Sequence, residues 1–245
     1  MKKRLFAAAL ALALAAACAV IYLRAGRAEL RSASYRAGEE GLTLVIDAGH
    51  GGEDGGAVSP SGLTESSVNL DVAARIDCLA AFFGVRTTMT RESEDIAYPD
   101  TADTTRKRKA EDQKARLRKI RSAPNAVLIS IHQNSYPDPD PSGAQALYAP
   151  TEGSLGLAER LQELLVASLD TSNRRAASEI QDTILLMNSV SCPAVLVECA
   201  FLSNPREEAL LRTDSYRLSL ATVITAGFLR SRGELSAVYG TEMPS

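Results

Sequence analysis

The segment LTLVIDAGHGG, residues 42–52, decides the fold of this 245-residue chain. Residues 42–47 form an apolar run rich in β-branched side chains, which is typical of a buried strand. A glycine-rich turn follows at once and carries His50. In open parallel sheets, ligands gather at the carboxyl ends of the strands, so this turn is the first place to expect a functional site.

Apolar runs and helical patterns alternate along the rest of the chain. Further strands are predicted over residues 85–90, 127–131, 144–148, 184–186 and 194–197. Helices are predicted from about Ser67 to Phe83 and over residues 106–121, 155–169 and 218–229, while residues 92–105 are predicted to form a loop. This alternation predicts a single α/β domain, in which helices cover both faces of a mostly parallel sheet.

Charge excludes one class of partner. The formal net charge is −3, so nothing in the composition indicates binding to nucleic acid. The helix predicted over 106–121 is mostly basic and could attract an anionic wall or lipid surface. We favour a solvated helix whose Ala110, Leu117 and Ile120 face the core.

The N-terminal segment indicates an envelope location. Met1 to Arg4 is basic, and Leu5 to Leu23 contains no charged residue, which is close to the roughly 20 residues of a membrane span. We therefore expect a membrane anchor over 1–23, a tether over 24–41, the main domain over 42–232 and a flexible tail over 233–245. The alternatives are a cleaved signal peptide or a lipoprotein site at Cys18, and all three place the domain outside the cytoplasm.

The cysteines and the standard nucleotide motifs add little. Cys18, Cys78, Cys192 and Cys199 lack zinc-finger spacing, and we interpret them as free thiols. Dinucleotide and phosphate loops, the zinc motif H-E-x-x-H and the serine nucleophile elbow are all absent from the sequence.

The two histidines suggest a metal site. His50 and His132 are the only histidines in the sequence. Each follows the carboxyl end of a predicted strand, so their imidazoles can converge. Catalytic zinc typically takes three protein ligands and a water. Glu65 is the leading third ligand, with Glu53 and Asp54 as alternatives, although an acid at a helix start also favours the helix dipole.

Glu198 ends the predicted strand that begins near Ala194, and it is either an ion-pair partner or a catalytic group. Beside a zinc site, a carboxylate can take a proton from the attacking water and pass it to a leaving amine.

Four segments together resemble the zinc-dependent N-acetylmuramoyl-L-alanine amidases of the amidase-3 type. They are VIDAGHGG at 45–52, Leu63–Glu65 with Asn69–Leu70, SIHQNS at 130–135 and VECAFLSN at 197–204. The resemblance spans residues 42–231 in the order found in that family. It implies zinc ligation by His50, Glu65 and His132, with Glu198 as the catalytic acid and base.

The same resemblance implies the reaction and the partners. The expected reaction is hydrolysis of the amide between the lactyl group of N-acetylmuramic acid and L-alanine in peptidoglycan. Stem peptides and glycan are the expected partners, together with the membrane through the N-terminal segment. Asn134 supports the site or binds substrate, unless it is an ordinary turn residue. Arg91 contacts a peptide carboxylate or, as we favour, braces a loop.

The short layout resembles the sporulation-type amidases, which strip peptides so that cortex muramic δ-lactam can form, although housekeeping amidases have the same site. Three rival functions stay open. One is another zinc hydrolase of wall peptides, an endopeptidase or carboxypeptidase. The second is a non-catalytic wall-binding protein, against which Glu198 argues. The third is an amidase that needs an activator protein.

Overall fold

One sheet organises the residues that the computed structural model describes, 41–241, with strands in the order β2-β1-β3-β6-β4-β5. The strands are β1 (Thr43–Ala48), β2 (Arg86–Met89), β3 (Ala126–Asn134), β4 (Gln145–Tyr148), β5 (Ser178–Glu179) and β6 (Ala194–Phe201). The helices are α2 (Glu65–Phe82), α3 (Thr105–Ser122), α4 (Ser154–Ser168), α5 (Leu185–Asn188), α6 (Pro205–Leu211) and α7 (Asp214–Val238).

The sheet is mostly parallel, which confirms the predicted α/β class. β1 runs parallel to β2 and β3, and β3 runs parallel to β6. The direction reverses at β4, which pairs antiparallel with β6, and β5 runs parallel to β4. Every residue of β1 is buried, as expected of a strand that is covered on both faces.

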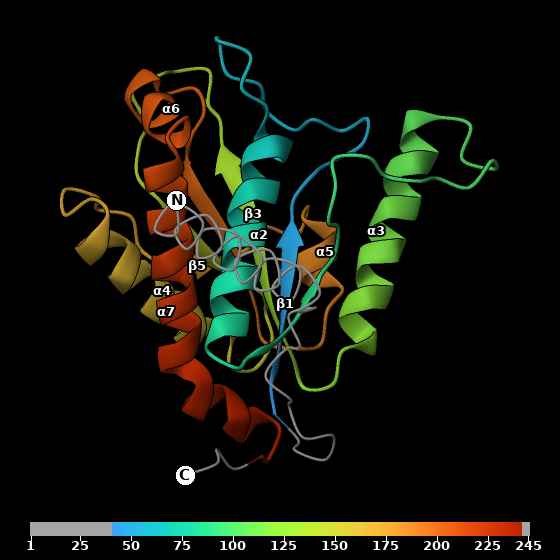
Figure 1. Cartoon of the computed structure of the whole chain (residues 1–245), viewed down its shortest axis with the longest axis vertical. Coiled ribbons are helices and arrows are strands. Elements are labelled where there is room, and N and C mark those ends of the chain that lie inside the picture. Colours follow the sequence, from blue (N-terminus) through green and yellow to red (C-terminus); the bar gives the residue numbers. More distant parts are fainter. Residues whose placement is uncertain (1–40, 242–245) are drawn as a thin grey trace, which may run out of the picture. The chain divides into compact units, whose positions relative to one another are not determined.

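Helices cover both faces of the sheet, as predicted. α2, α4 and α7 pack on one face and on one another, whereas α3 and α5 lie on the other (Figure 1). The larger apolar core lies on the first face, where Ile46 and Ile129 of the sheet join Ile76 and Phe228 of the helices. A smaller core lies beneath α3 and α5.

Two short elements differ from the prediction. Residues 184–186 were predicted as a strand, which is wrong, because Leu185–Asn188 forms helix α5 with Leu186 and Met187 buried. Periodicity cannot distinguish a strand from a helix in so short an apolar run. Helix α6 was not predicted. Asn204 caps it by accepting hydrogen bonds from the backbone N–H groups of Arg206 and Glu207.

The chain end also differs from the prediction. Residues after 232 were expected to form a flexible tail, but α7 continues to Val238 because Leu235 packs into the core and is only 1% exposed. On α3, Ala110 is exposed where we expected a core contact, whereas Arg116 is buried.

The predicted anchor over 1–23 and the tether up to residue 40 lie outside the described residues. Between residues 41 and 241, no helix is both long enough and apolar enough to span a membrane. The three cysteines in this part of the chain, Cys78, Cys192 and Cys199, are free thiols, as predicted.

Candidate active site

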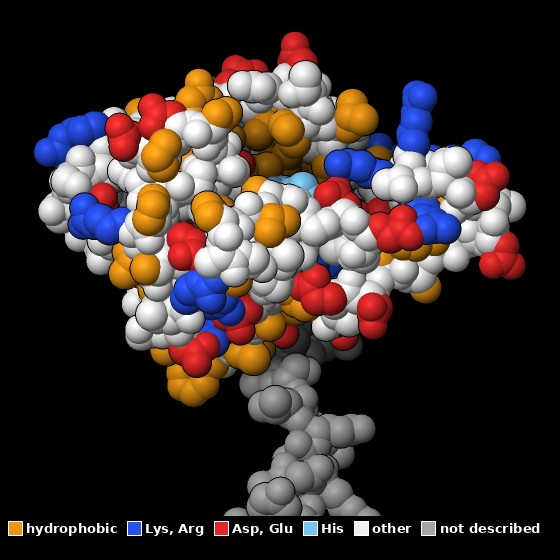
Figure 2. Space-filling model, turned by 90° about the horizontal axis from the view of Figure 1, so that it is seen from above, with side chains coloured by type: hydrophobic (Ala, Val, Ile, Leu, Met, Phe, Trp, Pro, Cys, Tyr) orange, Lys and Arg blue, Asp and Glu red, His pale blue; other side chains and the backbone are white. Residues whose placement is uncertain are grey.

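A cavity of about 910 Å³ opens at the edge of the sheet where β1, β3 and β6 end or bend. Seen from above, apolar side chains line this hollow and a histidine lies at its margin (Figure 2). α3 contributes Arg106, Lys109 and Gln113 to its lining, and residues 183–187 form another part of the wall. Leu185 of that wall is 70% exposed, which leaves an apolar surface beside the hollow.

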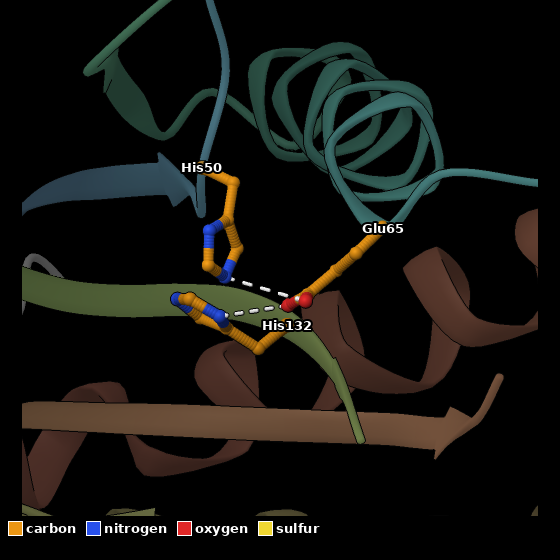
Figure 3. A group of neighbouring side chains, drawn as sticks. All are labelled: His50, Glu65 and His132. Atoms are coloured by element: carbon orange, nitrogen blue, oxygen red, sulfur yellow. Dashed lines mark hydrogen bonds and ion pairs between the residues drawn. The ribbon is translucent and has the colours of Figure 1, made fainter. Parts of the chain in front are cut away.

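His50, Glu65 and His132 meet on the floor of this cavity (Figure 3). Nε2 of His50 lies 3.3 Å from Oε2 of Glu65, and Nδ1 of His132 lies 3.0 Å from Oε1 of Glu65. The two imidazole centroids are 5.2 Å apart. One ligand atom from each of the three residues lies within 4.8 Å of the others, which is a spacing that one metal ion can bridge.

His132 is carried by a strand. We expected this residue just beyond a strand end, but β3 continues to Asn134, and His132 pairs in register with Glu198 of β6. The sheet therefore fixes the backbone of His132 through pairing with β6, one residue beyond the last pair between β3 and β1, and its side chain points toward the cavity (Figure 3).

His50 lies in a turn. It follows the end of β1 and adopts a left-handed backbone, with φ of 61°. Such a conformation is unfavourable for a side chain larger than glycine and persists only where neighbours enforce it. Gly49 is required beside it, because a Cβ atom at that position would collide with the His132 ring.

Glu65 opens helix α2 and is buried. Its Oε2 accepts a hydrogen bond from the backbone N–H of Ala57 at 2.9 Å, and its Oε1 accepts one from Gln133 at 3.1 Å. Burial alone would raise the pKa of Glu65, but the hydrogen bonds to His132 and His50 outweigh it and hold that pKa far below its ordinary value. Glu65 is therefore ionised, as a metal ligand must be.

Asp54 and Glu53, the alternative ligands, do not join the group of three. Oδ1 of Asp54 lies 3.1 Å from Nδ1 of His50, the ring nitrogen opposite the one that faces Glu65. Its Oδ2 lies 2.9 Å from Nζ of Lys109. Glu53 pairs with Arg108 at the surface. Asp54 is therefore placed to orient His50.

Glu198 faces the same cavity from β6. Its Oε2 is buried and accepts no hydrogen bond from any described residue. Burial, together with the negative charge of Glu65, raises the pKa of Glu198 to about 7. An unpartnered carboxyl group with such a pKa can exchange a proton near neutral pH, which suits a general acid and base.

Asn134 and Arg91 differ in their relation to the cavity. Asn134 lines it, although its Oδ1 also accepts a hydrogen bond from the backbone of Ser135 at 2.9 Å, as in an ordinary turn. Arg91 does not line it. Its guanidinium donates to the carbonyl groups of Ala48, Gly49 and Ser66, so it braces loops, and substrate contact by Arg91 finds no support.

Sequence reasoning missed a layer of buried polar residues under the site. Asp47 and Arg116 form an ion pair with 2.7 Å between Oδ1 and Nη1, and both are buried. Asn69 donates to the Gly49 carbonyl at 3.1 Å and accepts from Gln133 at 3.1 Å. Asp47 at a strand end was a visible signal, but nothing in the basic helix distinguished Arg116 from its solvated neighbours.

Comparisons with known proteins identify the family of this chain. Residues 44–230 match the Amidase_3 family, described as N-acetylmuramoyl-L-alanine amidase. The germination-specific N-acetylmuramoyl-L-alanine amidase of Bacillus subtilis is 37% identical over 191 residues, which cover 78% of this chain and 79% of that protein. The amidase LytC of the same organism is 31% identical, and the match covers 76% of this chain and 35% of LytC.

The chain is also similar to the solved structure of an amidase. The CwlD amidase from Clostridioides difficile, determined in complex with the GerS lipoprotein, superposes with a TM-score of 0.73 at 33% identity. That match covers 77% of this chain and 97% of the CwlD chain.

Proposed function

This chain belongs to the N-acetylmuramoyl-L-alanine amidases, and from that membership we propose that it hydrolyses peptidoglycan with a zinc ion held by His50, Glu65 and His132. The enzyme class follows from the family. The observation that supports the metal is the convergence of the three side chains, drawn from three separate segments, on one point of the cavity floor.

The donor set fits zinc. Two imidazole nitrogens and one carboxylate are a ligand set of known zinc hydrolases, and the cavity leaves room for a water and a substrate carbonyl beside them. When bound, such an ion supplies Lewis-acid polarisation of the lactyl carbonyl and a lowered pKa for water. Backbone donors from Ala57 and Gln133 keep the Glu65 carboxylate in its place.

Glu198 is the proposed proton carrier. Its carboxylate accepts the proton of the attacking water, and the resulting carboxylic acid donates that proton to the alanine nitrogen as the amide bond breaks. The absence of a hydrogen-bond partner on Oε2 among the described residues supports this role, because the oxygen is not committed to a structural contact. Asn134 is proposed to contact the substrate at the rim of the cavity.

The biological setting is a further part of the proposal. The germination-specific relative supports a role in germination or sporulation. We propose in addition that the purpose of the cleavage is formation of cortex muramic δ-lactam. We place the enzyme outside the cytoplasm, anchored through residues 1–23 and tethered through 24–41. The GerS complex of CwlD supports an activator protein as a partner of this chain.

Digestion of purified peptidoglycan by the full chain, followed by mass analysis, tests the activity. Zinc-loaded enzyme is expected to release free stem peptides from intact glycan, and a chelator is expected to abolish the release. Products cut within the stem peptide would instead identify an endopeptidase or carboxypeptidase.

The role of Glu198 has a matched test. Glu198→Gln is expected to lower kcat by about 10²–10⁴-fold while zinc content stays that of wild type. Glu179→Gln changes an exposed glutamate on β5 and serves as the control. If Glu198→Gln kept activity within a few-fold of wild type, the assignment would be wrong.

A further inference from the structure

We propose that the buried pair of Asp47 and Arg116 positions His50 for metal binding, so that Arg116 is a positioning residue of the site. This inference rests on the zinc site proposed above. It goes beyond the ligand set, because neither residue faces the metal position with a ligand atom.

Both terminal nitrogens of the Arg116 guanidinium bind the segment that ends in His50. The residue is 3% exposed, and its Nη1 donates to the Asp47 carboxylate and to the Ala48 carbonyl, both at 2.7 Å. Its Nη2 donates to the carbonyl of His50 itself at 2.5 Å. Nε donates to Asp112 at 2.9 Å, which fixes the guanidinium plane from its own helix. Although Arg116 borders the cavity, these hydrogen bonds join its guanidinium to protein groups, so we assign it a structural role.

Asp47 ties this arginine to the sheet. The residue is 1% exposed, and its Oδ1 accepts from Thr90 at 2.7 Å in addition to Arg116. Its Oδ2 accepts from Ser130 at 2.6 Å, two residues before His132 on β3. One carboxylate therefore connects β1, the end of β2, β3 and α3 directly beneath both histidines.

His50 needs such support because the sheet does not supply it. The last bond between the β1 segment and β3 runs from the Gly49 N–H to the Ile131 carbonyl. Beyond it, the left-handed backbone of His50 is held at its carbonyl by Arg116. Arg91 assists one and two residues earlier, at Gly49 and Ala48. Rotation of the His50 peptide would move the imidazole away from Glu65.

The chemistry favours arginine specifically. A planar guanidinium can hold a carboxylate and two carbonyl oxygens at fixed angles, whereas the lysine ammonium is a single point on a flexible stem. Arg116→Lys keeps a buried positive charge opposite Asp47 but loses the planar set of donors that binds the carboxylate and the two carbonyl groups at once. A purely structural charge pair would tolerate this change, but a positioning device would not.

The test compares Arg116→Lys and Arg116→Ala with Arg118→Ala, an exposed position on the same helix. Zinc affinity of the metal-free full chain is measured by chelator competition, and the cobalt-loaded protein gives a visible absorption spectrum that reports ligand geometry. Both Arg116 variants are expected to bind zinc about 10–100-fold more weakly, with an altered cobalt spectrum and a lower kcat at nearly constant KM. Added guanidinium is expected to restore part of the kcat of Arg116→Ala.

The outcomes are distinct. Wild-type protein without stoichiometric zinc would overturn the proposed function and this inference with it. If wild type binds zinc and the Arg116 variants keep its affinity and cobalt spectrum, only the positioning role is overturned. Should Arg116→Ala fail to fold, the Asp47→Asn, Arg116→Met double variant removes both charges together, which buried pairs often tolerate. Normal zinc affinity in that double variant would also overturn the proposal.

Discussion

His132 and His50 face the same carboxylate from differently built backbones. His132 lies within β3, where in-register pairing with Glu198 of β6 sets its direction. His50 lies beyond β1, on a left-handed residue whose carbonyl is held by the side chain of Arg116. The difference teaches that one imidazole is positioned by backbone pairing and the other by buried side chains, so substitutions outside the ligand set should affect them unequally.

The largest effect is expected at Gly49, where the turn that carries His50 approaches the ring of His132. Gly49→Ala places a Cβ atom against the His132 ring, so the imidazole must leave its position. We expect amidase activity to fall by at least about 100-fold, because ångström-scale misplacement at a reacting centre has effects of that size. Gly55→Ala is the control, since its Cβ would meet only Thr64 at 3.9 Å. Similar activity of the two variants would show that the close approach is unimportant.

Asp54→Asn should affect His50 alone. Asp54 contacts the ring nitrogen of His50 that points away from Glu65, whereas among the described residues Glu65 is the only carboxylate paired with His132. Loss of a carboxylate that orients a histidine ligand typically weakens metal binding by about 10–100-fold. Zinc affinity from chelator competition checks this. An unchanged dissociation constant would mean that the turn alone orients His50.

Replacing each histidine with glycine in the metal-free protein distinguishes the strand pairing that supports His132 from the side-chain contacts that support His50. His50→Gly relieves a left-handed backbone that costs an L-residue roughly 1–2 kcal/mol, whereas His132→Gly weakens a central strand. We expect His50→Gly to be the less destabilised variant by about 1–2 kcal/mol in urea unfolding with chelator present. The opposite ranking would contradict the comparison.

The smallest effect is expected at Lys109, which acts on His50 only through Asp54. Lys109 pairs with Asp54, but the lysine is mostly exposed, and surface ion pairs contribute about 0–1 kcal/mol. Lys109→Met should therefore change zinc affinity by less than about 5-fold. Lys107→Met, which breaks a comparable surface pair with Asp103, is the matched control. A larger loss at Lys109 alone would extend the positioning network to the surface.

Much of this site could be predicted from the sequence. Parallel strands bring their carboxyl ends to one edge, so the histidines and Glu198 could be grouped without coordinates. Glu65 was the leading third ligand from its place at a helix start, and the resemblance to the amidases implied it over Glu53 and Asp54. The histidines and Glu198 are identifiable because each follows or ends a strongly patterned apolar run.

The support for His50 could not be predicted in the same way. Arg116 lies among basic neighbours on α3, and periodicity assigned the buried face to Ala110, Leu117 and Ile120, of which Ile120 is buried, Leu117 is partly buried and Ala110 is exposed. A long polar side chain can be buried when it finds partners, and those partners come from β1, far away in the sequence. The apolar run at 184–186 was misassigned because its short length fits either a strand or a turn of helix.

The direction of β1 has a practical consequence for work with this enzyme. The chain reaches β1 at Gly41, while the cavity lies at the far end of that strand, about 20 Å away at roughly 3.3 Å per residue. A surface linkage made directly at residue 41 would therefore be attached at the end of β1 that is opposite the cavity. Immobilisation through that end is therefore a suitable format for presenting the enzyme to insoluble wall fragments.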